Sequence, residues 1–130
     1  MVVFMLKGKP QGKGRPRVTM HGTYTPRKTV AYENAIRAAY PGGYFTGAVM
    51  LKVMAFFAPP KSTSKKKRAE MLGRYYTHKP DGDNVLKIVK DALNGIAYND
   101  DAQVVDEQCC RFYGTEDAVV VMLQEVEIRS

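Results

Sequence analysis

The stretch DGDNVLKIVKDALNGIAYNDD, residues 81–101, decides the fold around it. Apolar residues recur there at the three- and four-residue spacing that marks the buried stripe of an α-helix: Leu86, Val89, Leu93 and Ile96. Asn94-Gly95 is a good left-handed cap, so we predict a helix from near Asp83 to this dipeptide. Aspartates stand at both ends of the stretch, two before the helix and two in the loop after it.

Segments on either side of this helix predict a mixture of strands and helices. Runs of β-branched and aromatic residues predict strands near residues 2–6, 48–57, 103–112 and 118–128. Thr25-Pro26 predicts the N-cap and first residue of a helix that runs to about residue 40. Small or apolar residues are expected on its packed face: Val30, Ala31, Ala35 and Ala38. Ser64 is expected to cap a short lysine-rich helix. The 130 residues fit one domain, residues 1–130.

The charge is distributed unevenly along the chain. Residues 1–80 contain 16 Lys and Arg and 2 Asp and Glu, whereas residues 81–130 contain 4 and 11. Basic residues alternate with Gly and Pro in KGKPQGKGRPRVTMHGTY, residues 7–24, which predicts a flexible loop leading into a hairpin across His21-Gly22. A solvated basic surface would explain the net charge alone, but its concentration in the first part of the chain favours a nucleic-acid partner.

Several classes of protein are not indicated. No apolar run approaches the roughly 20 residues of a membrane span, and the first residues lack the basic leader of a signal peptide. There is no Walker-type phosphate motif, and we expect neither a membrane nor an organic cofactor. Cys109 and Cys110 have no metal-ligand spacing and, on a strand, point to opposite faces. They predict reduced thiols and a cytoplasmic location.

Each aspartate of the 81–101 stretch has a structural explanation. Asp81 or Asp83 could cap a helix, and Asp100 or Asp101 could be a turn residue. Together they suggest chemistry, if the loop after the helix returns to the first pair. Two negative charges about 4 Å apart repel by roughly 4 kcal/mol at an effective dielectric of about 20, so such a cluster requires protonation or a cation. Carboxylates suit Mg²⁺ or Mn²⁺, which support phosphodiester hydrolysis.

Lys87 extends this pattern, because it follows Asp83 by one helical turn and shares its face. It could form a surface ion pair, or its ammonium group could reach a scissile phosphate. Asp91 could then support Lys87, and Asn84 could cap the helix or bind a phosphate.

Three segments resemble the RusA-type Holliday junction resolvases (crossover junction endodeoxyribonucleases). The longest is KPDGDNVLKIVKDALNGIAYNDDAQVV, residues 79–105, which is long and irregular and therefore specific. GKGRPRVT, residues 12–19, and PPKSTSKKKRAEM, residues 59–71, are similar to the N-terminal segments of that family. The resemblance covers most of the chain.

The resemblance implies an α/β (α+β) fold, a small mixed β-sheet flanked by helices. It also implies a bacterial or phage-encoded homodimer that resolves four-way DNA junctions by paired nicks with Mg²⁺ or Mn²⁺. Position in the motif assigns the catalytic residues and principal metal ligands: Asp81, Asp83 and Asp101, with Lys87 as the catalytic lysine. Asp100 is a secondary metal ligand. The DNA-binding candidates are the basic residues of the loop and motif and one amide: Lys13, Arg15, Arg17, Lys79 and Asn84.

Three hypotheses follow from these observations. The first is a metal-dependent endonuclease selective for four-way junctions. The second is a nuclease for other branched DNA, such as forks or flaps. The third is a non-enzymatic DNA-binding protein, whose binding would be salt-sensitive and whose aspartates would serve as caps and turn residues. The sequence does not single out an aromatic side chain that would insert at the crossover of a DNA junction. Tyr75 and Tyr76 are candidates, but packing on a strand explains them equally well.

Overall fold

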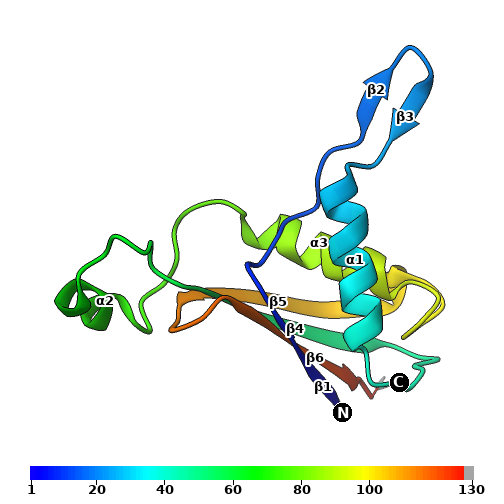
Figure 1. The fold of residues 1–130 in the computed structure, drawn as a ribbon. Coiled ribbons are helices and arrows are strands. Elements are labelled where there is room, and N and C mark those ends of the chain that lie inside the picture. The colour runs from blue at the N-terminus through cyan, green and yellow to red at the C-terminus, as the bar shows by residue number, and fades with distance from the viewer. Residues whose placement is uncertain (128–130) are drawn as a thin grey trace.

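A four-stranded mixed sheet forms the centre of the molecule (Figure 1), in a computed structural model that describes residues 1–127. Its strands are β1 (Val2–Lys7), β4 (Val49–Phe57), β5 (Val104–Tyr113) and β6 (Ala118–Glu125). They lie in the order β1-β6-β4-β5. β6 pairs antiparallel with both β1 and β4, whereas β4 and β5 are parallel. The parallel pair requires a crossover connection, and this connection contains helices α2 and α3.

Alternation along β4 explains which face of the sheet is covered. Its odd-numbered residues, from Val49 to Phe57, are buried, while the even-numbered residues are half-buried. Helices α1 (Arg27–Ala39) and α3 (Gly82–Leu93) lie together on one side of the sheet (Figure 1). One hydrophobic core fills the space between these helices and the sheet. The α+β fold predicted through the family resemblance is therefore confirmed.

Helix α3 closely follows the sequence prediction. Its stripe residues Leu86, Val89 and Leu93 are buried, and Gly95 has the positive φ of +76° expected of the cap position. Ile96 was expected to continue the stripe but is 37% exposed, because the helix ends at Leu93. The position of α3 is set by the core, and its two ends therefore hold the flanking loops at fixed places.

The predicted packed face of α1 is wrong. Its buried residues are Thr29, Tyr32, Glu33 and Ile36. Val30 is 43% exposed, and Ala31 and Ala38 are also exposed. Larger side chains bury more surface than alanine, and Glu33 is tolerated inside because Lys13 pairs with it. The N-cap is Pro26 rather than Thr25, and it makes no side-chain cap hydrogen bond.

Two parts of the chain extend away from the sheet and its covering helices (Figure 1). Strands β2 (Arg17–Thr19) and β3 (Gly22–Tyr24) form the predicted hairpin and pair only with each other. Helix α2 (Lys65–Met71) begins at Ser64, whose side chain accepts a hydrogen bond from the Lys67 N–H, as predicted. None of the helices in residues 1–127 is long and apolar enough to cross a membrane.

Candidate active site

Asp81 and Asp83 lie at the N-terminal end of α3. Asp81 is the N-cap, and its Oδ1 accepts a hydrogen bond of 2.9 Å from the Asn84 N–H. Its Oδ2 lies 3.1 Å from Lys79 Nζ. The hydrogen bond from Asn84, followed by the contact with Lys79, lowers the pKa of Asp81 below its ordinary value. Asp83 occupies the exposed first turn, so both carboxylates face solvent, where a cation can reach them.

The loop before Asp81 is held by side chains from the sheet. Arg111 of β5 donates from Nη1 to the carbonyl oxygens of His78 and Pro80, at 2.8 and 3.1 Å. Tyr76 donates to the Lys79 carbonyl and stacks on Phe57 with ring centroids 3.7 Å apart. These contacts make Arg111 a positioning residue for Asp81. Sequence analysis missed it, because its partners are backbone atoms about 30 residues away, and no motif marks such a contact.

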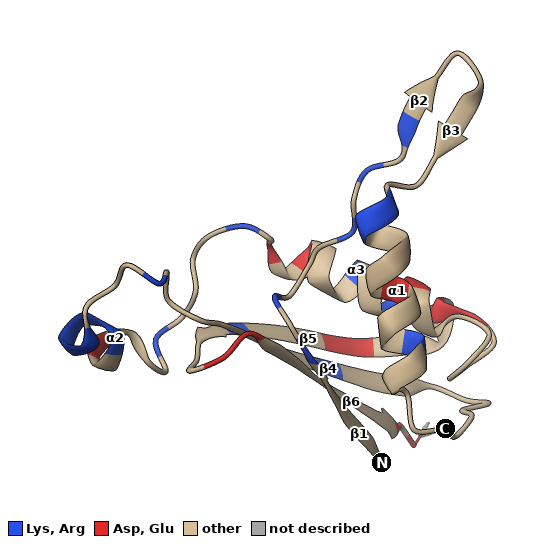
Figure 2. Cartoon of the chain, viewed as in Figure 1, with Lys and Arg blue, Asp and Glu red and all other residues tan. Residues whose placement is uncertain are grey.

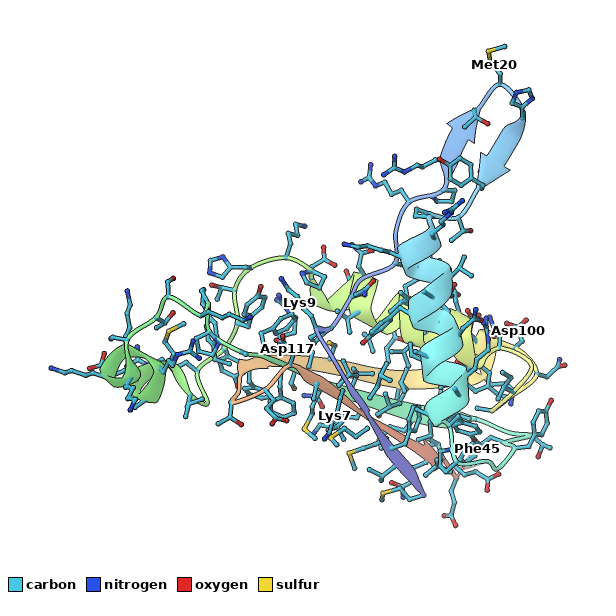
Figure 3. All side chains as sticks on the ribbon, viewed as in Figure 1. Lys7, Lys9, Met20, Phe45, Asp100 and Asp117 are labelled. Atoms are coloured by element: carbon cyan, nitrogen blue, oxygen red, sulfur yellow. The ribbon has the colours of Figure 1, made fainter. Side chains whose placement is uncertain are left out.

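Asp100 and Asp101 lie beyond the opposite end of α3. Asp101 begins the short 3₁₀ helix η1 (Asp101–Gln103), and its Oδ2 lies 3.5 Å from Nδ2 of Asn94, the C-cap of α3. Asp100 is the N-cap of η1 and accepts from the Ala102 N–H at 3.1 Å. Figure 3 shows Asp100 in the loop beyond α3. The sequence allowed Asp100 a structural role as a turn residue, and in the structure that role is the N-cap of η1.

Gln103 fixes the loop that carries these two acids. Its side-chain oxygen accepts from the N–H groups of Asn99 and Asp100, and its Nε2 donates to the carbonyls of Phe45 and Gly47 at 2.9 and 3.0 Å. Asp100 and Gln103 form a capping box. Sequence analysis missed Gln103, although the spacing of an N-cap residue and a glutamine three positions later is a recognisable signal.

The two acidic pairs are separated by the full length of α3. Its 12 residues span about 18 Å at the usual helical rise, and Figure 2 shows acidic segments near both ends. Within residues 1–127, no three His, Cys, Asp or Glu side chains are grouped closely enough to hold a metal ion. One chain thus brings Asp81 and Asp83 together and Asp100 and Asp101 together, but not the first pair to the second.

Lys87 is exposed on α3 beside a groove of about 490 Å³. Asn84, Lys13 and Arg15 also line this groove. The ion pair between Asp83 and Lys87 that the spacing allowed does not occur among the described residues. Lys87 therefore lines this groove together with Asp91, and it forms no ion pair within residues 1–127.

Lys13 differs from the other basic residues of the loop, because it is committed to internal ion pairs. Its Nζ lies 2.9 Å from Glu33 and 3.0 Å from Asp91. Burial acts to lower the pKa of Lys13, but the hydrogen bonds and charges of Glu33 and Asp91 outweigh it and raise the pKa. Asp91 was expected to support Lys87 and instead holds Lys13. Lys13 thus joins the loop to α1 and α3.

The loop lies close against α3 and requires glycine to do so. The Lys13 N–H donates to the Asn84 carbonyl at 3.0 Å. A Cβ at Gly12 would lie 2.9 Å from Asn84 Cβ, which is too close without a shift of the backbone. The start of the family-type segment, Gly12 and Lys13, therefore lies directly beside the helix that carries Asp83 and Lys87.

Arg15 and Arg17 are exposed, and they line a second groove of about 690 Å³ with Lys9 and Lys28. This groove reaches Pro80, the residue before Asp81. Figure 2 shows the basic segments along the loop and at the start of α1. A basic groove that adjoins a pair of carboxylates is the arrangement expected of a protein that processes nucleic acid. The cationic surface attracts the phosphates, and the carboxylates lie where a reactive centre would be needed.

The comparison with known proteins agrees with this class. Residues 7–124 match the family model of endodeoxyribonuclease RusA, and the chain belongs to the RusA endodeoxyribonuclease family. The uncharacterized protein YqaN of Bacillus subtilis (strain 168) is 36% identical over 137 residues, covering 96% of each chain. The predicted resemblance is confirmed.

Proposed function

We propose that this protein is a metal-dependent, structure-selective endonuclease that resolves four-way DNA junctions by paired nicks. The observation that carries the proposal is the continuity of the basic loop with the acidic end of α3. Arg15, Arg17 and Pro80 line the same groove, and Pro80 is next to Asp81 in the chain. A DNA backbone bound there would lie beside Asp81, Asp83 and Lys87. Membership of an endodeoxyribonuclease family supports the reaction type.

The donor groups suit Mg²⁺, or Mn²⁺ in its place. Asp81 and Asp83 offer exposed carboxylates at one end of α3, and Asp101, with Asp100 as a secondary ligand, offers carboxylates at the other. Hard oxygen donors of this type are the preferred ligands of both cations. When bound, the cation would activate water and neutralise charge that develops on the phosphate. The chain supplies the ligands, while Arg111 keeps Asp81 in place through the preceding loop.

The separation of the acids supports a homodimer. A two-fold axis can bring the N-terminal end of α3 from one protomer close to the C-terminal end of α3 from the other. Asp81 and Asp83 of one protomer then face Asp100 and Asp101 of its partner at both ends. Two equivalent composite sites result, as two symmetric nicks require. A rigid helix of about 18 Å prevents the same arrangement within a single chain.

The remaining residues are assigned to DNA. Lys87 has no carboxylate partner in residues 1–127, and its ammonium group is suited to stabilising charge on the scissile phosphate. Arg15 and Arg17 bind the backbone in the groove, and Asn84 contributes at its edge. The Lys79 side chain is 87% exposed and can contact phosphate while it remains near Asp81. Lys13 acts indirectly, by holding the loop.

Asparagine substitutions test the acidic residues. Asp81→Asn should lower nicking of a four-way junction in Mg²⁺ about 100-fold or more while junction binding persists. Asparagine is also a good N-cap, so the helix should remain folded. Asp106→Asn, at an exposed position on β5, is the matched control and should cut normally. Cleavage by Asp81→Asn at the wild-type rate would show that the assignment is wrong.

Mixing two inactive variants tests the composite site. In a dimer of one Asp83→Asn chain and one Asp101→Asn chain, one composite site carries both substitutions and the other carries neither. The mixture should therefore recover single nicks without recovering paired cuts. If both acids acted within one chain, each site would carry one substitution and the mixture would remain inactive.

The substrate is tested by comparing a mobile four-way junction, a fork and linear duplex under the same conditions. Preferential paired cutting of the junction supports the proposal. Preferential cutting of forks or flaps would identify a nuclease for other branched DNA. Salt-sensitive binding without nicking in Mg²⁺ or Mn²⁺ would identify a non-enzymatic DNA-binding protein.

The free thiols of Cys109 and Cys110 are consistent with the proposed location in a bacterial cytoplasm.

A further inference from the structure

The hairpin formed by β2 and β3 has no core of its own. All six residues of its strands are exposed, and neither strand pairs with the main sheet. Figure 1 shows it extending well beyond the start of α1. An isolated two-stranded hairpin is only marginally stable in water. Its sequence therefore does not serve the packing of this domain, and the side chains at its tip are available to a partner.

The tip of the hairpin has a defined turn and presents exposed apolar side chains beside the polar Thr19 and His21. Met20 is 98% exposed and Val18 is 82% exposed. Thr19 Oγ1 donates to the Gly22 carbonyl at 3.0 Å and accepts from the His21 N–H at 3.2 Å, which closes the turn around Met20. Figure 3 shows Met20 at the outermost point of the hairpin. The turn thus places a flexible apolar side chain where none of the other residues in 1–127 covers it.

The base of the hairpin is basic and contains no acid. The first Asp or Glu of the chain is Glu33, so the whole segment from the N-terminus through the hairpin lacks negative charge. Arg15, Arg17 and Lys28 surround the groove at the base of the hairpin. Positive charge at the base of the hairpin and an exposed apolar side chain at its tip fit a polyanion that also has an apolar interior. DNA has this chemistry, with its phosphates outside and its stacked bases inside.

We propose that the β2–β3 hairpin enters DNA at the branch point and that Met20 inserts between bases there as an apolar wedge. This inference rests on the proposed function and adds to it a means of recognising branched DNA. Bases at a branch are less fully stacked, so separating them costs less than in intact duplex. The wedge would therefore favour branched over linear DNA, while the arginines at the base of the hairpin bind either form.

The dimensions are compatible with this role. A two-stranded ribbon fits the major groove, which is about 12 Å wide. At about 3.3 Å per residue, the strand from Arg17 to Met20 reaches about 10 Å beyond the basic groove. This reach allows the tip to contact bases while Arg15 and Arg17 remain at the phosphates. Apolar side chains that insert between base steps, methionine included, partially unstack them.

Fluorescence of 2-aminopurine placed at the branch of a four-way junction tests the wedge, because the fluorescence rises when the base is unstacked. The experiment uses the full-length chain without divalent cations, so that the DNA stays intact. Wild-type protein should raise the fluorescence. Met20→Ala should lose most of that rise and bind the junction about fivefold more weakly, with duplex affinity unchanged. Met20→Leu keeps an apolar side chain of similar volume and should retain the wild-type response.

Two matched variants separate the wedge from general effects. Met5→Ala removes another exposed methionine, on β1, and Tyr75→Ala removes an exposed aromatic side chain that stacks on Phe112. Both should respond as wild type does. Equal fluorescence from wild type and Met20→Ala would overturn the wedge while leaving the proposed function intact, and so would a loss confined to Tyr75→Ala. A wild-type protein that does not bind the junction would overturn both proposals.

Discussion

Replacing Lys13 with methionine should destabilise the fold, although Lys13 lies in a loop that the sequence assigned to DNA. Its Nζ contacts both Glu33 and Asp91, at 2.9 and 3.0 Å. Methionine keeps the apolar stem but removes the charge. Glu33, whose side chain is only 10% exposed, then remains in the interior without a cation. An uncompensated buried carboxylate is the main cost of the substitution.

The exposed fractions of Lys13, Glu33 and Asp91 determine how much stability the substitution should remove. Breaking a fully buried ion pair costs about 3–5 kcal/mol, whereas an exposed pair contributes about 0–1 kcal/mol. Lys13, Glu33 and Asp91 are 18, 10 and 27% exposed, which lies between these limits. We therefore expect a loss of about 2 kcal/mol. For a domain of this size, that loss corresponds to a decrease in Tm of about 6–10 °C.

Urea and thermal denaturation of four proteins measure this loss. Lys13→Met is compared with wild type, with Lys13→Met/Glu33→Gln, and with Lys28→Met, an exposed lysine outside the ion pairs of residues 1–127. The double variant should recover about 1 kcal/mol, because glutamine needs no cation. Lys28→Met should change stability by less than about 0.5 kcal/mol.

The pH dependence gives an independent check. The folded-state pKa of Lys13 is raised above the ordinary value of 10.5. Its contribution is therefore complete below pH 10.5 and is lost as pH rises through the higher folded-state value. The difference in stability between wild type and Lys13→Met should shrink in that alkaline range. A Lys13→Met protein as stable as wild type at pH 7, or a double variant no more stable than the single one, would refute the reasoning.

Three further predictions concern the loops that carry the candidate site. Gln103→Ala removes contacts to four backbone groups and should lower the free energy of unfolding by about 2 kcal/mol in denaturation experiments. The 94–101 loop should also be cleaved faster by protease, and an unchanged rate of cleavage would contradict the anchoring role of Gln103. Gly12→Ala should cost about 1–3 kcal/mol and weaken junction binding in a titration, since its Cβ would meet Asn84 at 2.9 Å; normal values for both would contradict the close packing. The pKa of Asp81 is lowered, so its contribution to stability is present above pH 3.8 and is lost as pH falls through the folded-state value. Asp81→Asn should therefore remove this loss of stability at acid pH in denaturation experiments. An unchanged pH dependence would contradict the contribution assigned to Asp81.

Local pattern was sufficient to predict most individual elements. The spacing of Leu86, Val89 and Leu93 predicts α3, and Ser64 predicts the start of α2, because helical periodicity and caps involve neighbouring residues. The hairpin across His21-Gly22 and the four main strands follow in the same way. The packed face of α1 was predicted wrongly, since short side chains indicate helix propensity more reliably than burial.

The sequence by itself determined the residue types of the candidate site and the polarity of its surroundings. Acids, a lysine and a basic Gly/Pro loop are local features of the chain, and the family motif that contains them is contiguous. These features were enough to predict the family and the class of reaction, because the chemistry of a site depends first on the groups available to it.

Only the tertiary structure decided how those groups are arranged. Asp81 and Asp101 are near in sequence, but α3 is a rigid rod of about 18 Å that keeps them apart. Lys13 belongs to a basic loop, yet its ammonium group is held within the protein because Glu33 and Asp91, on two different helices, converge on it. Met20 is exposed because the hairpin pairs only with itself. Each result depends on contacts between distant segments, which are created only when the core forms.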